Sequence, residues 1–230
     1  MADSKVLLIT GASSGIGAET AREAVKSGWK VALAARREEK LQALSDELGG
    51  LGKALPVVCD VTSWDAQKSM VAKTINYFGG MDAVFANAGI VGIPGGYSDS
   101  DPEQWKEMVL TNVYGVGLTL RASLEELKRK KGHVLITSSA AARLTIPGSM
   151  YCATKWAVSA IGSTLREELK GTGVRSTVIE PGMVDTRFAD HPRPNCLNVK
   201  DIARTVMFAL SQPPSVNVHV MTTYPIHSDF

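Results

Sequence analysis

Cysteine is scarce in this 230-residue sequence, and its placement excludes several classes of protein. The three cysteines, Cys59, Cys152 and Cys196, lie far apart and form no C-x-x-C pair. Such an odd, scattered set argues against both a disulfide framework and a zinc site. The four histidines show no metal-ligand spacing either. We therefore expect no metal, and a reducing compartment, the cytoplasm, as the location.

Long apolar runs and an excess of charge of one sign are also missing. No segment approaches the ~20 apolar residues that a membrane-spanning helix requires. The run from Val6 to Ile9 is too short for a signal sequence and is typical of a buried strand. The formal net charge is only +2, with both signs mixed along the length. Composition therefore gives no support for binding to nucleic acid or to a membrane surface.

What the sequence does contain is a regular alternation of short apolar runs and longer helical patterns. The expected strands are Val6–Thr10, Lys30–Ala35, Ala54–Cys59, Ala83–Ala86, His133–Ser138, Val174–Ile179 and Val216–Val220. The expected helices are Gly15–Ser27, Glu38–Leu48, Trp64–Phe78, Pro102–Lys130, Met150–Lys170 and Val199–Leu210. Several strands are apolar at consecutive positions, which indicates burial on both faces. We predict an α/β fold: one domain over residues 1–230, a doubly wound parallel sheet (Rossmann fold) with helices on both faces.

Two irregular segments interrupt this alternation. Residues 90–101 are rich in glycine and proline, and residues 188–198 carry two charged residues, a histidine and two prolines. Both follow strand ends on the side where open α/β sheets bind ligands. We expect them to form the rim of a substrate site.

A glycine-rich turn follows the first expected strand and opens the first expected helix. Its residues are Gly11, Ser13, Ser14, Gly15, Ile16 and Gly17, within Thr10–Gly17. The spacing is G-x-x-x-G-x-G rather than the commoner G-x-G-x-x-G. Glycines let the backbone approach a pyrophosphate, and the helix N-terminus offers N–H groups and partial positive charge. We therefore predict that this turn binds a dinucleotide.

The end of the second expected strand indicates which dinucleotide. An enzyme that uses NAD places an acidic residue here to bind the ribose 2′-OH, whereas a basic residue suits the 2′-phosphate of NADP. Ala35 occupies the acidic position, and Arg36 and Arg37 follow it. A guanidinium–phosphate contact favours NADP(H) over NAD(H) as the cofactor. The alternative is a solvated arginine pair at the start of a helix.

At this point the sequence resembles the short-chain dehydrogenase/reductase family. The resemblance extends over nearly the whole chain and rests on motifs that occur in order. They are Thr10–Gly17, Asp60-Val61, Asn87-Ala88-Gly89, Asn112, Ser138, Tyr151-x-x-x-Lys155 and Pro181-Gly182 with Thr186. The family fold is the one that the strand and helix patterns predict.

The resemblance also implies roles for these residues toward the cofactor. Asp60 and Val61 would flank the adenine, and Asn87, Ala88 and Gly89 would support the central strand and the cofactor ribose. Val184 and Thr186 would hold the nicotinamide carboxamide, beside Pro181 and Gly182. Some relatives that use NADP carry a basic residue where this chain has Ser14, so Arg36, with Arg37, would supply most of the 2′-phosphate contact.

Tyr151 and Lys155 form the centre of the predicted chemistry. Four residues apart on a helix, their side chains leave the same face about 6 Å apart along the axis. A free phenol titrates near ~10 and is a poor base at neutral pH, but a nearby ammonium favours the phenolate. The oxidised nicotinamide would add a second positive charge. We count both residues as catalytic and as cofactor-binding.

Two further residues complete the predicted catalytic set. Ser138 lies thirteen residues before Tyr151, the spacing of the family motif, and its hydroxyl would hydrogen-bond the substrate oxygen. Ser139 is the neighbouring alternative, and strand alternation would point the two in different directions. Asn112, by the resemblance, would keep a helix kink and a water that relays protons from Lys155.

The predicted function is an NADP(H)-dependent oxidoreductase that acts on the CH–OH group of a secondary alcohol or hydroxy acid, with Tyr151 as general acid and base. One alternative is specifically a 3-hydroxy acid dehydrogenase, which the Ile179-Glu180-Pro181-Gly182 run resembles. A second is a non-catalytic NADPH-binding protein on the same fold. Arg143 either meets an acidic substrate or is simply solvated. Relatives pair through the helices at Pro102–Lys130 and Met150–Lys170, which implies a homodimer or homotetramer.

Overall fold

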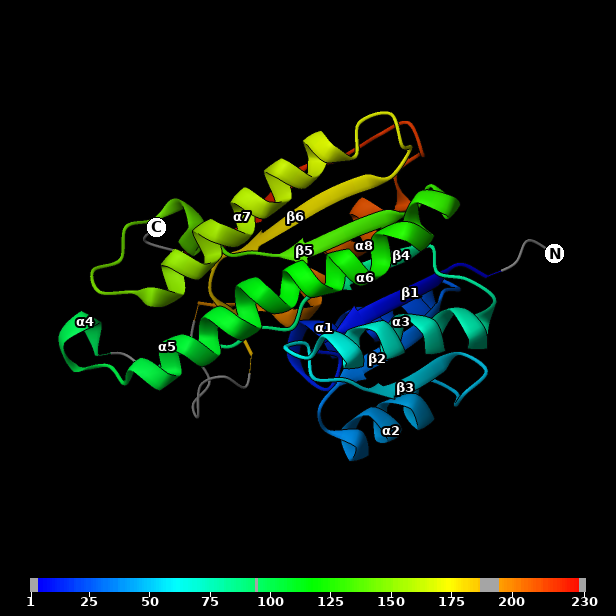
Figure 1. Cartoon of the computed structure of the whole chain (residues 1–230), viewed down its shortest axis with the longest axis horizontal. Coiled ribbons are helices and arrows are strands. Elements are labelled where there is room, and N and C mark those ends of the chain that lie inside the picture. Colours follow the sequence, from blue (N-terminus) through cyan, green and yellow to red (C-terminus); the bar gives the residue numbers. More distant parts are fainter. Residues whose placement is uncertain (1–3, 94, 187–194, 228–230) are drawn as a thin grey trace.

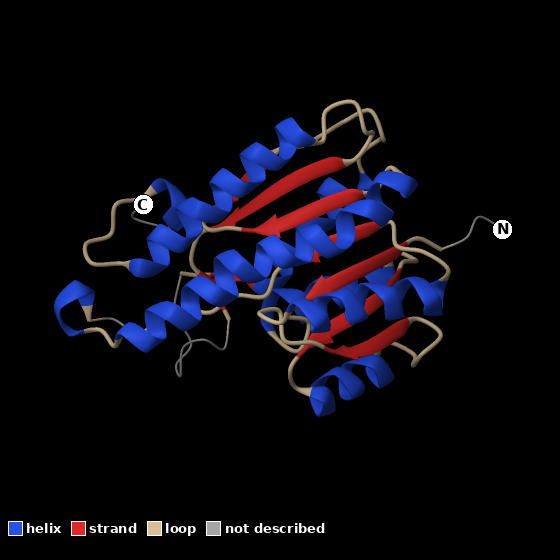
Figure 2. Ribbon diagram, in the orientation of Figure 1, coloured by secondary structure: helices blue, strands red, loops and turns tan. Residues whose placement is uncertain are grey.

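The computed structural model describes residues 4–93, 95–186 and 195–227 (Figure 1). Its main sheet has seven parallel strands in the order β3-β2-β1-β4-β5-β6-β9 (Figure 2). They are β1 (Val6–Thr10), β2 (Lys30–Ala35), β3 (Ala54–Val58), β4 (Ala83–Ala86), β5 (His133–Thr137), β6 (Arg175–Pro181) and β9 (Val220–Thr223). The prediction of a doubly wound parallel sheet is confirmed.

Helices cover both faces of this sheet. They are α1 (Gly15–Lys26), α2 (Glu38–Glu47), α3 (Trp64–Phe78), α4 (Gly96–Asp99), α5 (Pro102–Val109), α6 (Gly115–Lys130), α7 (Met150–Glu168) and α8 (Val199–Ser211). A π-helical segment, η1 (Leu110–Tyr114), joins α5 to α6, and a 3-10 turn, η2 (Ala140–Arg143), follows β5. Two short strands, β7 (Val184–Asp185) and β8 (Leu197–Asn198), pair with each other outside the main sheet.

The core consists of two apolar layers because successive strand side chains alternate between the faces of the sheet. Leu7 and Ile9 pack with α1, α2 and α8, whereas Leu8 between them packs with α3, α6 and α7. All three are fully buried. Figure 1 shows α3, α6 and α7 in front of the sheet, with α8 behind it. Burial on both faces explains why the strands are apolar at consecutive positions.

The order of the strands places a crevice beside β1. The chain goes from β1 outward to β2 and β3, and then returns to add β4 on the other side of β1. The loops after β1 and β4 therefore leave the sheet in opposite directions. The glycine-rich turn and Asn87 to Gly89 lie at this position.

Two predicted elements differ from the structure. The last strand is Val220–Thr223 rather than Val216–Val220. Before it, the Asn217 side-chain oxygen accepts the hydrogen bond from Ser176 N at 2.7 Å, where a ladder carbonyl would otherwise accept it. The regular ladder with β6 starts only at Val220.

The helix predicted over Pro102–Lys130 is also divided. Its middle turn is the π-helical η1, in which Gly115 N–H donates to the carbonyl of Leu110. One extra residue in this turn changes the helical phase, and Asn112 faces the interior, where it is buried. The kink predicted at Asn112 is therefore the π-helical turn η1.

Candidate active site

The glycine-rich turn brings the backbone of β1 against the loop after β4. Gly11 has φ +68°, and a Cβ added there would lie 2.9 Å from Ala88 Cα. A Cβ on Gly17 would lie 2.5 Å from the carbonyl oxygen of Gly11. Only glycine fits either position, because the colliding atoms are backbone. The turn leaves the N-terminus of α1 facing outward beside Ser14, its N-cap residue.

The loop after β4 is tied to β1 and β5 by side-chain hydrogen bonds. Thr10 Oγ1 accepts from Asn87 N at 3.0 Å and from Ala88 N at 3.1 Å. Asn87 Nδ2 donates to Thr10 O at 3.0 Å, and Asn87 Oδ1 accepts from Thr137 Oγ1 at 3.1 Å. Asn87 thus joins three neighbouring strands. Thr10, the first residue of the predicted motif, and Thr137, which the sequence analysis did not name, hold the loop after β4 in place.

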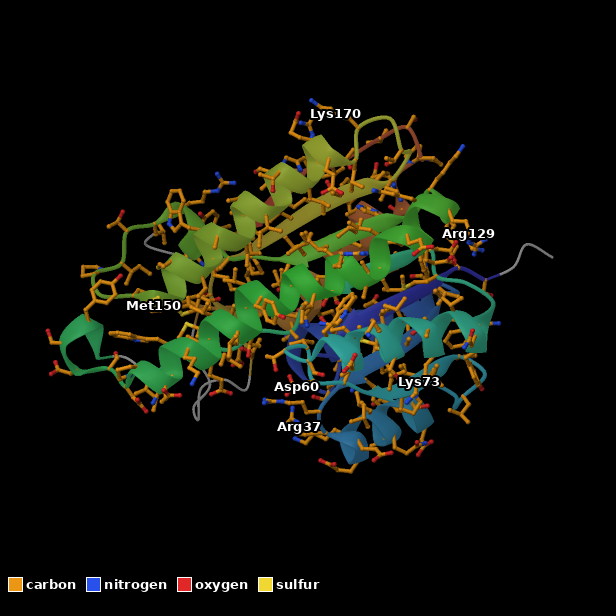
Figure 3. The ribbon with its side chains drawn as sticks, in the orientation of Figure 1. Arg37, Asp60, Lys73, Arg129, Met150 and Lys170 are labelled. Atoms are coloured by element: carbon orange, nitrogen blue, oxygen red, sulfur yellow. The ribbon has the colours of Figure 1, made fainter. Side chains whose placement is uncertain are left out.

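Arg37 rather than Arg36 contacts the glycine-rich turn. Its Nη2 donates to Ser13 Oγ at 2.9 Å and to Ser14 Oγ at 3.2 Å. Arg36 is exposed beside it. Figure 3 shows Arg37 close to Asp60, at the carboxyl ends of β2 and β3. The guanidinium of Arg37 is therefore more than a solvated charge, because it lies over the mouth of the turn.

Other predicted cofactor residues surround the same crevice. The Asp60 carboxylate accepts from Thr62 N and Oγ1, and Gln67 donates to the carbonyl oxygen of Val61. Thr186 lies opposite the turn, since a Cβ on Gly15 would be 3.6 Å from its Cγ2. Gly182 N donates to Thr223 O at 2.7 Å, directly after Pro181 ends β6. Val184 starts the short strand β7, and Ile16 packs against the core.

Tyr151 and Lys155 lie in the first two turns of α7. The helix begins after Ser149, whose hydroxyl accepts from Cys152 N at 3.2 Å. Lys155 Nζ lies 5.6 Å from the centroid of the Tyr151 ring and donates to Thr137 O at 3.0 Å. Burial lowers the pKa of Lys155 to about 8, so the amine stays largely protonated near neutral pH. The structure thus brings the cation next to the phenol.

The pKa of Tyr151 is set by two opposing effects. Burial, the larger effect, raises it above the ordinary phenol value, and the neighbouring Ser139 hydroxyl lowers it. A base at this position therefore depends on nearby positive charge and on the Ser139 hydroxyl. Lys155 supplies the charge from the same helix face.

The predicted placement of Ser138 at Tyr151 is wrong. Ser138 Oγ donates to Lys155 O at 3.0 Å and lies 2.8 Å from Ser159 Oγ, so its hydroxyl faces the middle of α7. Ser138 N continues the ladder of β5 by donating to Ile179 O. Strand alternation therefore turns Ser139, and not Ser138, toward Tyr151.

Asn112 joins three parts of the site. Its Oδ1 accepts from Ile90 N at 2.8 Å, and its Nδ2 donates to Ile90 O at 2.9 Å and to Thr154 Oγ1 at 3.1 Å. A Cβ on Gly89 would lie 3.3 Å from Asn112 Oδ1 and 3.7 Å from Lys155 Nζ. Gly89, Asn112 and Lys155 therefore meet on one side of the site.

Arg143 is paired with a buried carboxylate rather than simply solvated. Its Nε and Nη2 both donate to the carboxylate of Glu180, each at 3.0 Å. The sequence analysis did not assign Glu180 a role. The sequence did contain a signal for such a role: Glu180 is a charged residue within an apolar strand, and a buried carboxylate requires hydrogen-bond or charged partners.

The expected substrate rim is partly in the described structure. Of residues 90–101, residue 94 lies outside the described part; Gly96 lies against the loop before α7, since a Cβ on Gly148 would be 2.6 Å from Gly96 Cα. In the other rim segment, 188–198, only residues 195–198 are described, and 188–194 lie outside. Within the described ranges, no helix is long and apolar enough to cross a membrane, and no three potential metal ligands lie together.

Comparisons with known proteins agree with this geometry. The family model for short chain dehydrogenases matches residues 5–196. An uncharacterized oxidoreductase of Staphylococcus haemolyticus is 38% identical over 96% of this chain and 97% of its own. An alcohol dehydrogenase structure from the archaeon Thermococcus sibiricus, complexed with 5-hydroxy-NADP, is 32% identical with a TM-score of 0.91 and covers 98% of both chains. Serine dehydrogenase from Escherichia coli is 30% identical with a TM-score of 0.90, over 98% of this chain and 100% of that one.

The fold and the arranged site define a dinucleotide-dependent oxidoreductase. The chain belongs to the short chain dehydrogenase family.

Proposed function

We propose that this chain is an NADP(H)-dependent oxidoreductase that interconverts an alcohol and the corresponding carbonyl, with Tyr151 as general acid and base. One observation carries the proposal: Lys155 Nζ lies 5.6 Å from the centroid of the Tyr151 ring, beside the carboxyl end of β5, where Ser139 caps η2. This is the edge of the sheet from which the glycine-rich turn leaves β1.

The cofactor-binding residues fit a dinucleotide with a 2′-phosphate. The glycine-rich turn and the N-terminus of α1 would hold the pyrophosphate. The 2′-phosphate would bind where Arg37 reaches Ser13 and Ser14, with Arg36 beside it. Two structures with which the chain shares its fold are of complexes with 5-hydroxy-NADP and with NADP+.

The protein side of the reaction is a proton transfer at Tyr151 Oη. Hydride would be supplied or accepted by the nicotinamide when it is bound. For carbonyl reduction, Tyr151 donates its proton to the substrate oxygen; for alcohol oxidation, the phenolate accepts it. Lys155 favours the phenolate through its charge, and Ser139 stabilises the charge that develops on the oxygen. Asn112 would hold the relay from Lys155 by fixing the loop at Ile90.

Tyr151→Phe tests this mechanism directly. It removes one hydroxyl and keeps the ring that packs beside Lys155. Turnover in both directions should fall by at least ~10²-fold, the usual contribution of general acid–base catalysis, while NADPH binding stays near the wild-type value. NADPH absorbance measures turnover, and cofactor fluorescence titration measures binding. Unchanged carbonyl reduction by Tyr151→Phe would contradict the mechanism, and absence of turnover in the wild type over a broad substrate panel would favour the non-catalytic NADPH-binding protein.

A second test concerns the choice of cofactor. Arg37→Ala should weaken NADPH binding by at least ~10-fold, because a charge-assisted contact to the 2′-phosphate is lost, and should leave NADH binding nearly unchanged. Lys40→Ala, at an exposed position on α2, serves as the control for loss of one positive charge. Wild-type rates that are equal or higher with NADH would overturn the assignment of NADP(H).

A 3-hydroxy acid is the second candidate substrate. The fold-sharing protein from Escherichia coli is a serine dehydrogenase, and serine is a 3-hydroxy acid. Arg143 does not supply a free cation for such an acid, since Glu180 already neutralises it. A panel of ketones, aldehydes and 3-hydroxy acids that includes serine distinguishes the two candidates. Activity confined to the hydroxy acids would establish the second.

We further propose a cytoplasmic homodimer or homotetramer. Its cysteines are free thiols, as a reducing compartment requires, and exposed apolar side chains lie along α5, η1 and α7. The partner in the reaction is a small-molecule alcohol or carbonyl compound.

A further inference from the structure

A second polar cluster, the Glu180 cluster, lies directly behind the site and consists of Arg143, Ser159, Glu180 and Thr222. Glu180 is fully buried near the end of β6. Its Oε1 accepts from Arg143 Nη2 at 3.0 Å and from Ser159 Oγ at 2.9 Å. Its Oε2 accepts from Arg143 Nε at 3.0 Å and from Thr222 Oγ1 at 2.9 Å. Each carboxylate oxygen therefore has two donors.

The donors come from three different elements. Arg143 is the last residue of η2, Ser159 lies in α7, and Thr222 lies in β9. A bidentate guanidinium–carboxylate pair fixes both distance and orientation, which a single hydrogen bond does not. The Glu180 cluster therefore fixes the end of η2 relative to β6.

Ser139, the residue beside Tyr151, is the N-cap residue that directly precedes η2. Ser139 Oγ caps this turn by accepting from Ala141 N at 3.1 Å, and it donates to the carbonyl oxygen of Pro181 at 3.4 Å. Pro181 directly follows Glu180. Both ends of this four-residue turn are thus held by adjacent residues of β6.

The same cluster reaches the backbone of Lys155. Ser159 Oγ, which donates to Glu180, lies 2.8 Å from Ser138 Oγ, and Ser138 donates to Lys155 O at 3.0 Å. The buried hydroxyl of Ser138 therefore connects the Glu180 cluster to the turn of α7 that carries Lys155. This accounts for a serine that points away from Tyr151.

We propose that the Arg143–Glu180 pair is a positioning device for the reaction, which holds the Ser139 hydroxyl at Tyr151 through η2. The inference rests on the proposed function. Neither residue is assigned a contact with substrate or cofactor, so both are positioning residues. Arg143 is about half exposed but Glu180 is fully buried, so loss of the guanidinium also costs stability, which the melting temperature measures separately. The contribution that we assign to the pair in the reaction is the geometry of the turn.

Other titratable groups lie near the pair. The hydrogen bond to Glu180 is the main cause of a raised pKa for Arg143, and Tyr224 adds to it. Burial lowers the pKa of His219, and the charge of Glu180 opposes that effect. A pH profile of a variant therefore has to be compared with that of a control pair elsewhere in the protein.

The chain offers such a control in Arg129 and Glu126. Arg129 Nε and Nη2 also donate to both oxygens of a buried glutamate, at 2.7 and 2.6 Å, and Arg129 is also exposed. Figure 3 shows Arg129 at the far end of the molecule from Met150, the neighbour of Tyr151. The two pairs share chemistry and burial and differ in their distance from the site.

The experiment compares Arg143→Gln with Arg129→Gln for kcat, KM, NADPH binding, melting temperature and the pH profile of alcohol oxidation. Arg143→Gln should lower kcat by roughly 10- to 100-fold, the effect of misplacing a positioned group. KM and NADPH affinity should change by less than about 3-fold, within 0.7 kcal/mol of wild type. The rise of activity with pH should move to higher pH, because Tyr151 loses the neighbouring hydroxyl that lowers its pKa. Arg129→Gln should lose similar thermal stability and keep the wild-type kcat and profile.

Arg143→Lys keeps the charge but not the bidentate contact, so its kcat should lie between the wild type and Arg143→Gln. It carries the same test if Arg143→Gln does not fold. A wild-type kcat and pH profile in a folded Arg143 variant, or equal losses in the Arg143 and Arg129 variants, would overturn the inference. The proposed function fails separately, on undiminished activity of Tyr151→Phe. An inactive Tyr151→Phe with a fully active Arg143→Gln removes the positioning role alone.

Discussion

Ser138 and Ser139 differ at the residue scale in the direction that the end of β5 gives to each side chain. Thr137 and Ser139 are two positions apart and turn toward the crevice, where they reach Asn87 and Tyr151. Ser138 lies between them and is buried against α7. The sequence already indicated that neighbouring strand residues point in opposite directions. The thirteen-residue spacing between Ser138 and Tyr151, however, includes a loop, and the length of a loop does not determine which strand residue faces Tyr151.

Alanine substitutions should separate the two serines. Ser139→Ala removes the donor to Tyr151 and should lower kcat by ~10²-fold or more, as loss of a positioned oxyanion donor does. Ser138→Ala leaves the site geometry supported by Arg143 and should cost much less activity, with a stability loss of about 1 kcal/mol from its buried hydrogen bonds. Steady-state kinetics and urea unfolding measure both effects. A larger kinetic loss in Ser138→Ala would restore the thirteen-residue spacing as the better guide.

The other site residues show which chemistry the sequence pattern can predict. Gly11 and Gly17 were predictable because only glycine satisfies the backbone contacts that a tight turn after a strand requires. Arg37 was named only as a partner of Arg36, since periodicity does not specify which arginine turns back toward Ser13. Glu180 was missed because its three partners come from distant segments.

At the element scale, the hydrophobic pattern predicted five of the six expected helices and six of the seven sheet strands to within two residues, in order. It failed where tertiary contacts override local preference. The π-helical η1 depends on Asn112 reaching Ile90, and the start of β9 depends on Asn217 reaching Ser176. The four-residue α4 and the 3-10 turn η2 are shorter than any periodicity can reveal.

The packing of α7 on β6 gives a test at this scale. A Cβ added to Gly162 would collide with Cγ2 of Val178, a stiff β-branched side chain in the sheet. The overpacking in Gly162→Ala should cost about 1–3 kcal/mol of unfolding free energy. The higher helix propensity of alanine offsets ~1 kcal/mol of that cost. The measurement is chemical denaturation.

Gly52→Ala is the matched control for that substitution. Gly52 lies in the turn before β3 with nothing within 4 Å of an added Cβ, and its φ is not in the left-handed region. Alanine there should stabilise the protein by about 0.4–1 kcal/mol, because it lowers the conformational entropy of the unfolded chain. If Gly162→Ala were as stable as Gly52→Ala, close packing of α7 on the sheet would not be the reason for the glycine.

At the scale of the whole molecule, the two faces of the sheet differ in what their helices leave uncovered. Figure 2 shows α5 and α6 following one another along one line, with α7 beside them, in front of the sheet. Val109, Leu110 and Tyr114 on α5 and η1 are exposed, and so is Trp156 on α7. An apolar surface of this kind is typical of an interface between protein chains. It coincides with the helices through which the family resemblance implies pairing.

Assembly through this surface can be tested with two charges placed within it. The wild type should sediment as a multiple of the 24.5 kDa chain, and Val109→Glu with Tyr114→Glu should shift it toward the monomer, because two carboxylates would be buried without partners. Phe208→Glu, at an exposed position of α8 behind the sheet, controls for the loss of a surface aromatic residue. It should leave at least the dimer intact, and a fall from tetramer to dimer in that variant would place a second interface at α8. A monomeric wild type at micromolar concentration would contradict the proposed assembly, since an apolar surface that drives pairing should be covered under those conditions.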